Sequence, residues 1–508
     1  MHTTKITQTL ALAGCAPAGK LSHTYCGLLP VMALLVATLG KLRQGKRACA
    51  VLALCAATAM ALPAQTFTSL FSFGGNLGGP QAGLVQATNG EFYGTANAVF
   101  KITSTGTLTW LFRFDGADGL PPVAGLIQAT NRDFYGTTYA GGANLNIFGL
   151  GAGTIFKITP SGTLTTLYSF CSQSGCTDGS NPQGGLVQAT NGDFYGTTAL
   201  GGAYGAGGTV FKITPGGTLT TLYSFCALVS CPDGYSPAGL VQATNGDFYG
   251  TTYGGGAHEG GTIFKITPSG ALTTLYSFCA QSGCIDGEFP QAAPVQATNG
   301  NFYGTTSGGG ANGNYGTVFE ITPSGALTTL YSFCSQSGCT DGTDPVAGLV
   351  QATNGNFYGT TEDGGANGNY GTVFEIAPSG ALTTLHSFDG ADGEGPGALV
   401  QATDGNFYGT TGGGGASGDG TVFSLSIGLG PFVETQPTFG EVGQFREILG
   451  TDLTGATSVS FNGTAAAFSV MSPSLIAARI PAGATSGTVQ VVTPSGTLSS
   501  NVPFRVVP

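Results

Sequence analysis

The sequence predicts an all-β protein in which a seven-bladed β-propeller is followed by a β-sandwich. Repetition is the first observation behind this prediction: the triplet Phe-Tyr-Gly occurs at Phe92, Phe134, Phe194, Phe248, Phe302, Phe357 and Phe407, with spacings of 42 to 60 residues. Repeats of about this length are typical of units that bury their apolar faces against their neighbours. Composition is the second observation, because 88 of the 508 residues are Gly and only 8% are charged, as expected of a turn-dense β protein.

Each copy contains four short runs of Val, Ile, Leu, Thr, Phe and Tyr, which are clearest in residues 239–278. LVQAT and DFYGTT flank Asn245 and Gly246, a pair that predicts a type I′ hairpin with positive φ at both residues. TIFKIT and ALTTLYSF flank Pro268-Ser269-Gly270, which predicts a second tight turn. The four runs therefore predict an antiparallel meander that is apolar or Thr on both faces, as in a sheet packed between two others.

A propeller, an open solenoid and separate beads could all be built from such units, and the chain ends favour the propeller. An unpaired fourth strand, Thr66–Phe73, precedes the first copy, and the last copy ends with its third strand, Thr421–Ile427. If the N-terminal strand completes the last blade, all 28 strands are paired and the exposed edges of an open array disappear. Residues 65–428 are therefore expected to form the closed ring.

Residues 1–64 are expected to be a leader. Basic residues in 41–47, an apolar run in 48–61 and small residues at its end are typical of a secretory signal, which we place at 41–61 or 41–64. We interpret the 40 preceding residues as lying upstream of the true start. The alternatives are a lipobox at Leu12–Cys15 and an uncleaved membrane anchor.

Eight cysteines follow the leader, and they form four C-x4-C pairs. These pairs are Cys171/Cys176, Cys226/Cys231, Cys279/Cys284 and Cys334/Cys339. Each pair comes directly after the fourth strand of a repeat, which in an exported chain predicts four local disulfides that staple loops. A zinc site is the alternative, but it needs four ligands that converge from separate blades. No metal and no cofactor is therefore predicted.

The charge of the body disfavours nucleic acid as a partner. Beyond residue 61 the chain has 9 Lys+Arg and 26 Asp+Glu, a formal net charge of −17. Such a surface repels phosphate backbones.

The pattern changes after the repeats, where residues 429–436 are expected to be a linker and residues 437–508 a separate domain. Short alternating strands between Gly and Pro turns predict a β-sandwich there, with Gln444–Leu449 as its first strand. The motifs at 455–459, 461–463, 480–483 and 492–494 resemble the IPT/TIG family. The resemblance implies an immunoglobulin-like β-sandwich that serves as a spacer or accessory module of an extracellular protein.

The repeat itself, GLVQATNGxFYGTT followed by GTVFKITPSG, resembles the GloVer (Gloeo/Verruco) tandem-repeat family of bacterial exported proteins in all seven copies. The resemblance implies a secreted or cell-surface location and no known reaction.

Residues that recur in every copy are interpreted first as packing groups. The Gln of the first strand, at positions 86, 128, 188, 242, 296, 351 and 401, is expected to bond the backbone of a neighbouring blade. The Tyr of each Phe-Tyr-Gly is expected to fill the space between blades.

The variable loops are the candidate binding site. In a meander blade, the loop between the second and third strands emerges at the same end as the loop to the next blade. Variable loops at one end of a rigid scaffold are typical of binding sites. The candidate ligand contacts there are Tyr204, His258, Asn312, Tyr315, Asn367, Tyr370 and Asp419.

Catalytic motifs are not evident in the sequence. His258 and His386 are the histidines beyond the leader, and no nucleophile elbow, HExxH, P-loop or calcium-loop spacing occurs. We therefore expect an exported, non-enzymatic protein that recognises an extracellular polysaccharide or a surface protein, without membrane insertion of the mature chain. The alternatives are a purely structural surface component and a polysaccharide lyase or hydrolase whose carboxylates converge from different blades.

Overall fold

The computed structural model describes residues 65–75 and 78–507, whose regular structure is almost entirely β. Residues Ala64–Pro508 form one compact unit. Single 3-10 turns occur at Ser174–Cys176 (η3), Ser282–Cys284 (η4) and Ser337–Cys339 (η5). The predicted secretory signal, the lipobox alternative and the anchor alternative lie outside the described residues.

Repeated four-stranded sheets make up the larger part of the unit, and corresponding strands have nearly the same bounds in each. The first strands are β2 (Val85–Gln86), β6 (Ile127–Gln128), β10 (Val187–Gln188), β14 (Tyr235–Gln242), β18 (Val295–Gln296), β22 (Val350–Gln351) and β27 (Val400–Gln401). The second strands are β3 (Phe92–Thr95), β7 (Phe134–Thr138), β11 (Phe194–Thr198), β15 (Phe248–Gly254), β19 (Phe302–Thr306), β23 (Phe357–Thr361) and β28 (Phe407–Gly413).

The third and fourth strands complete each sheet in antiparallel order. The third strands are β4 (Ala98–Ile102), β8 (Thr154–Ile158), β12 (Thr209–Ile213), β16 (Thr262–Ile266), β20 (Thr317–Ile321), β24 (Thr372–Ile376) and β29 (Thr421–Ser426). The fourth strands are β5 (Leu108–Arg113), β9 (Leu164–Ser169), β13 (Leu219–Ser224), β17 (Leu272–Ser277), β21 (Leu327–Ser332), β25 (Leu382–Ser387) and, from the start of the chain, β1 (Thr66–Ser72).

The second and third strands hold the core of each repeat, and the Gly of Phe-Tyr-Gly is required by their pairing. Gly250 lies opposite Phe264, and a Cβ at Gly250 would come within 2.7 Å of the Phe264 ring and 2.6 Å of the Gly239 carbonyl oxygen. Only a residue without a side chain lets the ring lie flat against the neighbouring strand. The fourth strands are more exposed, so the prediction of two buried faces is wrong for them.

The predicted type I′ turn is wrong. Gly246 has a φ of 90°, whereas Asn245 is not among the residues with positive φ. The Gly246 N–H donates to the Ala243 carbonyl and the Ala243 N–H to the Asp247 carbonyl, so the hairpin is a three-residue loop with a Gly bulge. Asn245 prefers this turn because its Oδ1 accepts a hydrogen bond from the Asp247 N–H at 3.0 Å.

Aromatic stacking joins each repeat sheet to the next, and the last sheet to the first. The Tyr of one Phe-Tyr-Gly stacks on the Phe of the following copy with ring centroids 4.0 to 4.3 Å apart. Tyr408 of the last copy stacks in the same way on Phe92 of the first, at 4.1 Å. These Tyr and Phe rings are almost fully buried, which confirms that the repeated Tyr packs between sheets.

Hydrogen bonds from two repeated polar residues follow the same circuit. Each first-strand Gln accepts a hydrogen bond at its Oε1 from the backbone N–H of the Thr in the preceding copy's hairpin, at 2.8 to 3.1 Å. Gln86 closes the circuit by accepting from the Thr403 N–H at 2.9 Å. The first Thr of each FYGT segment donates to a carbonyl of the next copy, and Thr410 donates to the Ala82 carbonyl. The predicted role of the Gln is thus confirmed.

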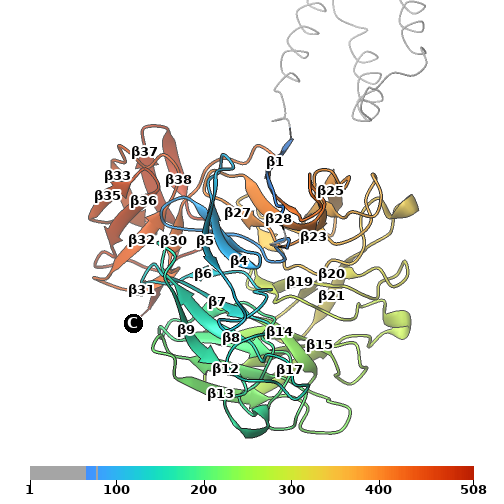
Figure 1. The fold of residues 1–508 in the computed structure, drawn as a ribbon. Helices are drawn as coiled ribbons and strands as arrows, with labels where there is room; N and C mark the ends of the chain where they lie inside the picture. Colours follow the sequence, from blue (N-terminus) through green and yellow to red (C-terminus); the bar gives the residue numbers. More distant parts are fainter. Residues whose placement is uncertain (1–64, 76–77, 508) are drawn as a thin grey trace, which may run out of the picture. The chain divides into compact units, whose positions relative to one another are not determined.

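The N-terminal strand completes the last repeat sheet, as predicted. β1 pairs antiparallel with β29, and Thr66 lies opposite Ser426 (Figure 1, where β1 is the blue strand near the orange strands of the last repeat sheet). This sheet has one strand more than the prediction allowed, because both β27 and a short β26 (Glu394–Pro396) flank β28.

Two further antiparallel sheets follow, and we call them the C-terminal sheet pair. One consists of β30 (Glu434–Gln436), β32 (Phe445–Leu449), β36 (Leu475–Arg479) and β35 (Phe468–Ser472). The other consists of β34 (Thr464–Ala465), β33 (Ser458–Phe461), β37 (Val489–Thr493) and β38 (Gly496–Ser499), and β31 (Phe439–Glu441) pairs separately with β39 (Arg505–Val507). Both sheets contribute to one buried core, which includes Ile448, Ile476, Val459 and Val491.

The boundary predicted before this pair is too late. Residues 429–436 were expected to be a linker, yet β30 lies in this range and pairs with β32, so strands precede the predicted first strand Gln444–Leu449. β30 is only three residues long, so the sequence around it carries little strand signal, and its pairing with β32 defines it as a strand.

Within the described residues, the C-terminal sheet pair contacts the repeat sheets at one end only. We call this the hairpin end, because the Asn-Gly hairpins form it. Ser474 Oγ donates to the Thr88 carbonyl at 3.2 Å, and Asn501 Nδ2 donates to the Gln351 carbonyl at 2.8 Å. Arg132, which has a φ of 69° where other copies carry Gly, forms an ion pair with Glu447. The Arg thus tolerates an unfavourable backbone conformation at a position where it joins the two parts.

Candidate ligand-binding rim

The two sets of loops predicted to share one end do so. The backbone N–H of Gly202, Gly256 or Gly310, in a loop between second and third strands, donates at 2.9 Å to the second Cys carbonyl of the preceding repeat. The same bond forms without cysteines from Gly415 to Gly390, at 2.8 Å. We call this end the loop rim, formed by loops 140–153, 200–208, 254–261, 308–316, 363–371 and 412–420 with the adjoining loops to the next repeat.

All four predicted disulfides are present, joining Cys171 to Cys176, Cys226 to Cys231, Cys279 to Cys284 and Cys334 to Cys339. Each bond closes a short loop that begins at the end of a fourth strand. Cys279, Cys284 and Glu288 place possible ligand atoms within 4.8 Å of one another. The two sulfurs are bonded to each other and offer no thiolate, so the zinc alternative has no support at this position.

A buried carboxylate organises three of these four loops, and the sequence interpretation missed it. Asp286 is fully buried and accepts hydrogen bonds from Tyr276 Oη at 2.8 Å, the Ala280 N–H at 2.9 Å and the Gln281 N–H at 3.1 Å. Asp178 and Asp341 make the same contacts, and in their repeats burial raises the pKa of Tyr168 and Tyr331 to about 12. The signal was a Tyr ten residues before the Asp in each copy.

Two of the predicted ligand contacts make structural hydrogen bonds. Asn312 Nδ2 donates to the Ser332 carbonyl at 2.9 Å and to the Phe333 carbonyl at 3.1 Å. Asn367 Nδ2 donates to the Ser387 carbonyl at 2.7 Å. Both amides therefore tie a rim loop to the fourth strand of its own sheet, and the sequence could not distinguish this use from ligand binding.

The other predicted contacts lie on the same rim but not in one cluster. Tyr204 and Tyr315 are 58% and 39% exposed, and His258 is exposed. Tyr370 is half-buried and packs against the core beside Phe388, and Asp419 is half-buried. In the part of the chain that the structure describes, no hydrogen bond, ion pair or ring contact joins any two of the seven predicted residues. The rim thus presents separate exposed groups around a circle.

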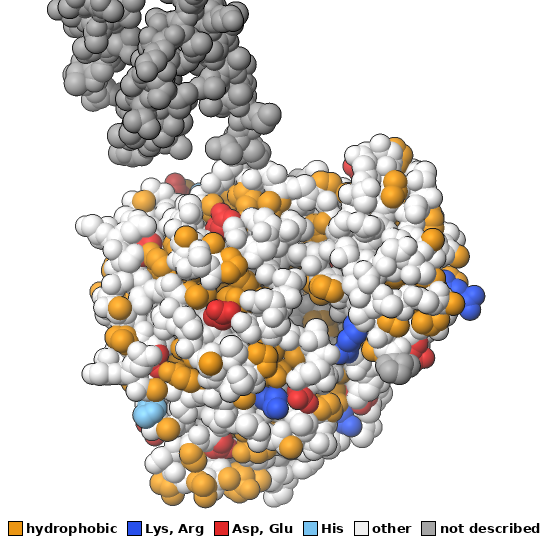
Figure 2. Space-filling view, turned by 180° about the vertical axis from the view of Figure 1, so that it is seen from behind, with side chains coloured by type: hydrophobic (Ala, Val, Ile, Leu, Met, Phe, Trp, Pro, Cys, Tyr) orange, Lys and Arg blue, Asp and Glu red, His pale blue; other side chains and the backbone are white. Residues whose placement is uncertain are grey.

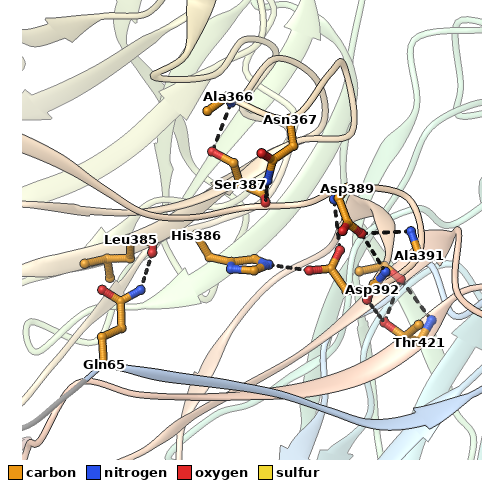
Figure 3. Close-up of polar contacts among 11 residues, drawn as sticks. Gln65, Ala366, Asn367, Leu385, His386, Ser387, Asp389, Ala391, Asp392 and Thr421 are labelled. Carbon is orange, nitrogen blue, oxygen red and sulfur yellow. Dashed lines mark hydrogen bonds and ion pairs between the residues drawn. The ribbon is translucent and has the colours of Figure 1, made fainter. Parts of the chain in front are cut away.

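His386 has an acidic partner, which makes it the strongest candidate for chemistry on the rim (Figure 3). Its Nε2 lies 2.7 Å from Asp392 Oδ2, and Asp392 Oδ1 accepts from the Asp389 N–H at 2.9 Å. Hydrogen bonds from the Asp392 backbone, followed by those of its side chain and of Ala391, hold the pKa of Asp389 below its usual value. The His386 ring stacks on Phe67 of β1, with centroids 3.7 Å apart.

The sequence position of this pair indicates a structural role. His386 occupies the slot of Tyr168, Tyr223, Tyr276 and Tyr331, and Asp392 takes the place of the buried Asp that receives those hydroxyl groups. The hydroxyl of Thr421 contacts Asp392, but its Oγ1 donates to the Asp392 carbonyl at 3.0 Å and bonds Thr411 Oγ1. Among the described residues, no hydroxyl or thiol group forms a hydrogen bond with the His386 imidazole, so the pair has no nucleophile to activate.

Replacing His386 by Tyr is expected to preserve the fold and any ligand binding, because Tyr makes the equivalent contact in other repeats. We expect the free energy of unfolding to change by less than about 1 kcal/mol, a typical value for one hydrogen bond. Chemical denaturation of H386Y measures this. Replacement by Ala is the contrasting variant, since it leaves Asp392 without its partner, and a larger loss of stability in H386Y than in H386A would contradict the structural role.

Three cavities lie away from the loop tips. One of about 730 Å³ lies between the hairpin end and the C-terminal sheet pair, and its lining includes Arg132, Asp404 and Asp452. A second of about 520 Å³ is lined by first-strand Gln and Val side chains together with Glu434 and Arg505. The third, of about 320 Å³, is surrounded by Gln, Ala, Gly, Val and Leu from all repeats and contains no acidic residue in its lining. A lyase or hydrolase would need carboxylates there, so this cavity does not favour that alternative.

Residues 96–292 and 280–467 match the sequence model of a repeat described as the Gloeobacter/Verrucomicrobia repeat, and the matches together span more than half of the chain. No curated protein matches the chain. The described residues contain no helix long and apolar enough to cross a bilayer.

Several solved structures are similar at low identity. The extracellular domain of a protein described as a hybrid two-component system from B. thetaiotaomicron is 13% identical, with a TM-score of 0.48, and the alignment covers 88% of this chain and 59% of that one. A fungal alcohol oxidase of the AA5 family is 14% identical, with a TM-score of 0.45 and coverages of 87% and 94%. A gluconolactonase from Xanthomonas campestris is 12% identical, with a TM-score of 0.36 and coverages of 73% and 92%. These similarities are too low to transfer an activity.

Proposed function

Since the chain belongs to the Gloeobacter/Verrucomicrobia repeat family, we propose that residues 65–428 form a seven-bladed β-propeller whose loop rim binds an extracellular ligand without catalysing a reaction. The ligand is a polysaccharide or a surface protein. The C-terminal sheet pair is, in this proposal, an immunoglobulin-like domain of the IPT/TIG type that acts as a spacer. The protein is exported and acts outside the cell.

The observation that carries this proposal is that the two ends of the repeats differ: one end contacts the C-terminal sheet pair, and the other end carries the variable loops. Contacts from the C-terminal sheet pair fall on the hairpin end, through Thr88, Arg132, Gln351 and Thr403. The opposite end carries loops that differ between repeats in length and sequence, on sheets that are joined by identical contacts. A rigid ring with variable loops is well suited to recognition, because the scaffold holds the loops in place while their sequences change.

The proposed ring and its export are supported by separate observations. The stacking of Tyr408 on Phe92 and the pairing of β1 with β29 are the contacts that a closed propeller requires between its last and first blades. Four disulfides are typical of proteins that fold in an oxidising compartment. A body with sparse charge and an excess of acidic residues also favours neutral or basic ligands over nucleic acids.

A glycan and surface-protein binding screen on residues 64–508 tests the proposal. We expect saturable binding that leaves the ligand intact and falls at least tenfold in Y204A/Y315A, which removes two exposed rim aromatics. F445A is the matched control, because Phe445 is 66% exposed on the C-terminal sheet pair. Binding that falls in F445A but not in Y204A/Y315A would place the function elsewhere, and cleaved products would support an enzyme.

A further inference from the structure

One rim loop ends in an apolar tip that the fold does not bury. In loop 140–153, Leu145, Phe148 and Leu150 are 64 to 65% exposed and Ile147 is 49% exposed. The loop contains no charged residue between Ala140 and Gly153. Four exposed apolar side chains within six residues form a patch of the kind that marks an interaction surface, whereas single exposed apolar residues are ordinary.

The backbone of this tip satisfies its own hydrogen-bonding groups through one buried residue. Asn146 is 6% exposed, and its Oδ1 accepts from the Phe148 N–H at 3.0 Å and the Leu150 N–H at 3.1 Å. Its Nδ2 donates to Asn181 Oδ1 at 2.9 Å, which fixes the tip to the next loop of the rim. Asn146 N also donates to the Leu150 carbonyl at 2.6 Å. These bonds remove part of the desolvation cost that free N–H groups would bring to an apolar phase.

A second apolar tip lies on the same rim in the following repeat. Leu228 is 66% exposed and Val229 is 97% exposed, in the loop closed by the disulfide between Cys226 and Cys231. The Cys231 N–H donates to the Leu228 carbonyl at 3.0 Å, which gives the tip the form of a closed turn. This loop also lacks charged residues between its cysteines. Two exposed, uncharged tips, each held by internal hydrogen bonds, thus belong to neighbouring repeats at one end of the sheets.

We propose that the two tips bind peripherally to an uncharged or zwitterionic lipid surface, with the apolar side chains entering its interfacial layer. Side chains of Leu, Ile, Phe and Val offer no donors for sugar hydroxyl groups, so a carbohydrate does not explain them. An anionic surface is disfavoured because the body has a formal net charge of −17 and the tips carry no Lys or Arg. Figure 2 shows that charged side chains are sparse and scattered on one face of the protein.

The mature chain is expected not to insert into a membrane, and the proposed contact differs from insertion because only side chains of the two tips enter the interfacial layer. It is peripheral and uses loop tips, as interfacial apolar segments do, rather than a spanning segment. It goes beyond the proposed recognition function and does not depend on it, because Tyr204 and Tyr315 are outside the two tips. Loss of glycan binding and loss of lipid binding can therefore be separated with different variants.

Flotation of residues 64–508 with phosphatidylcholine vesicles tests the inference. We expect the protein to float with the vesicles, and the vesicle affinity to fall at least tenfold in L145S/F148S/L150S and severalfold in L228S/V229S. F445S is the control, because Phe445 has the same exposure as Phe148 but lies on β32. Vesicles with phosphatidylglycerol are expected to bind less protein at low salt.

A tryptophan placed at the tip gives a second readout that does not depend on affinity. The emission of F148W is expected to shift to shorter wavelength on addition of phosphatidylcholine vesicles, whereas F445W does not shift. Absence of flotation by the unsubstituted protein, equal flotation of the triple variant, or an unshifted F148W would each overturn the inference. Gel filtration supplies the last test: a dimer that the triple variant abolishes, without vesicle binding, would assign the tips to a second copy of the chain.

Discussion

Deleting residues 65–73 is expected to abolish the cooperative unfolding transition of residues 64–508. The deletion removes β1, exposes the edge of β29, and takes Phe67, Phe71 and Phe73 out of two cores. Burial of one Phe contributes about 3 to 5 kcal/mol. Phe73 is fully buried and Phe67 and Phe71 are half-buried, so their combined loss, together with the lost pairing to β29, approaches the whole stability of a typical domain, about 5 to 15 kcal/mol. Calorimetry and the near-ultraviolet circular dichroism spectrum measure the loss.

The pairing itself, rather than chain length, is tested by adding the strand back. A synthetic peptide with the sequence TFTSLFSF is expected to restore part of the transition, because it can pair with β29 as β1 does. The milder variant F73A removes one buried ring and is expected to cost about 3 to 5 kcal/mol. An unchanged melting temperature after deletion would mean that the last repeat sheet is stable with an open edge, and the closed ring would have no energetic role.

Replacing Glu434 by Gln is expected to stabilise the protein above neutral pH. Glu434 lies on β30 and lines the cavity of about 520 Å³ among Gln and Val side chains, and burial raises its pKa from 4.5 to about 7. A raised carboxyl pKa means that the folded state favours the neutral form. The contribution of neutral Glu434 to the free energy of unfolding is therefore fully present below pH 4.5. This contribution is lost as the pH rises from 4.5 through 7.

The size of this effect follows from the pKa change and is at most about 3 kcal/mol at pH 8. Denaturation of E434Q and the unsubstituted protein at pH 4 and pH 8 measures it, and the difference is expected at pH 8 alone. E441Q is the control, since Glu441 is exposed on β31 of the same part of the chain. An equal gain in the free energy of unfolding at both pH values would show that E434Q does not act by removing the ionisation of Glu434.

Much of the candidate site was predictable because its chemistry is local or repeated. Each C-x4-C pair lies five residues apart after the same strand, so its disulfide needs no distant partner. The common end of the two loop sets follows from the up-and-down order of four strands. The structural bonds of Asn312 and Asn367 were not foreseen because an amide that bonds a carbonyl 20 residues away looks like any exposed loop residue in the sequence.

By itself, the sequence determined the repeat, its four strands, the packing role of the recurring Gln and Tyr, and the completion of the last repeat sheet by the N-terminal strand. Periodic apolar residues and turn residues encode these features locally, and seven copies make the pattern unambiguous. The tertiary structure decided the turn geometry at Asn245, the pairing of β30, the burial of Glu434 and the contact of Arg132 with Glu447. The contact of Arg132 with Glu447 and the burial of Glu434 depend on groups far apart in the chain, which no local pattern contains. The turn at Asn245 and the pairing of β30 are more local, but the same residues are compatible with more than one hydrogen-bond pattern, and the structure decides between them.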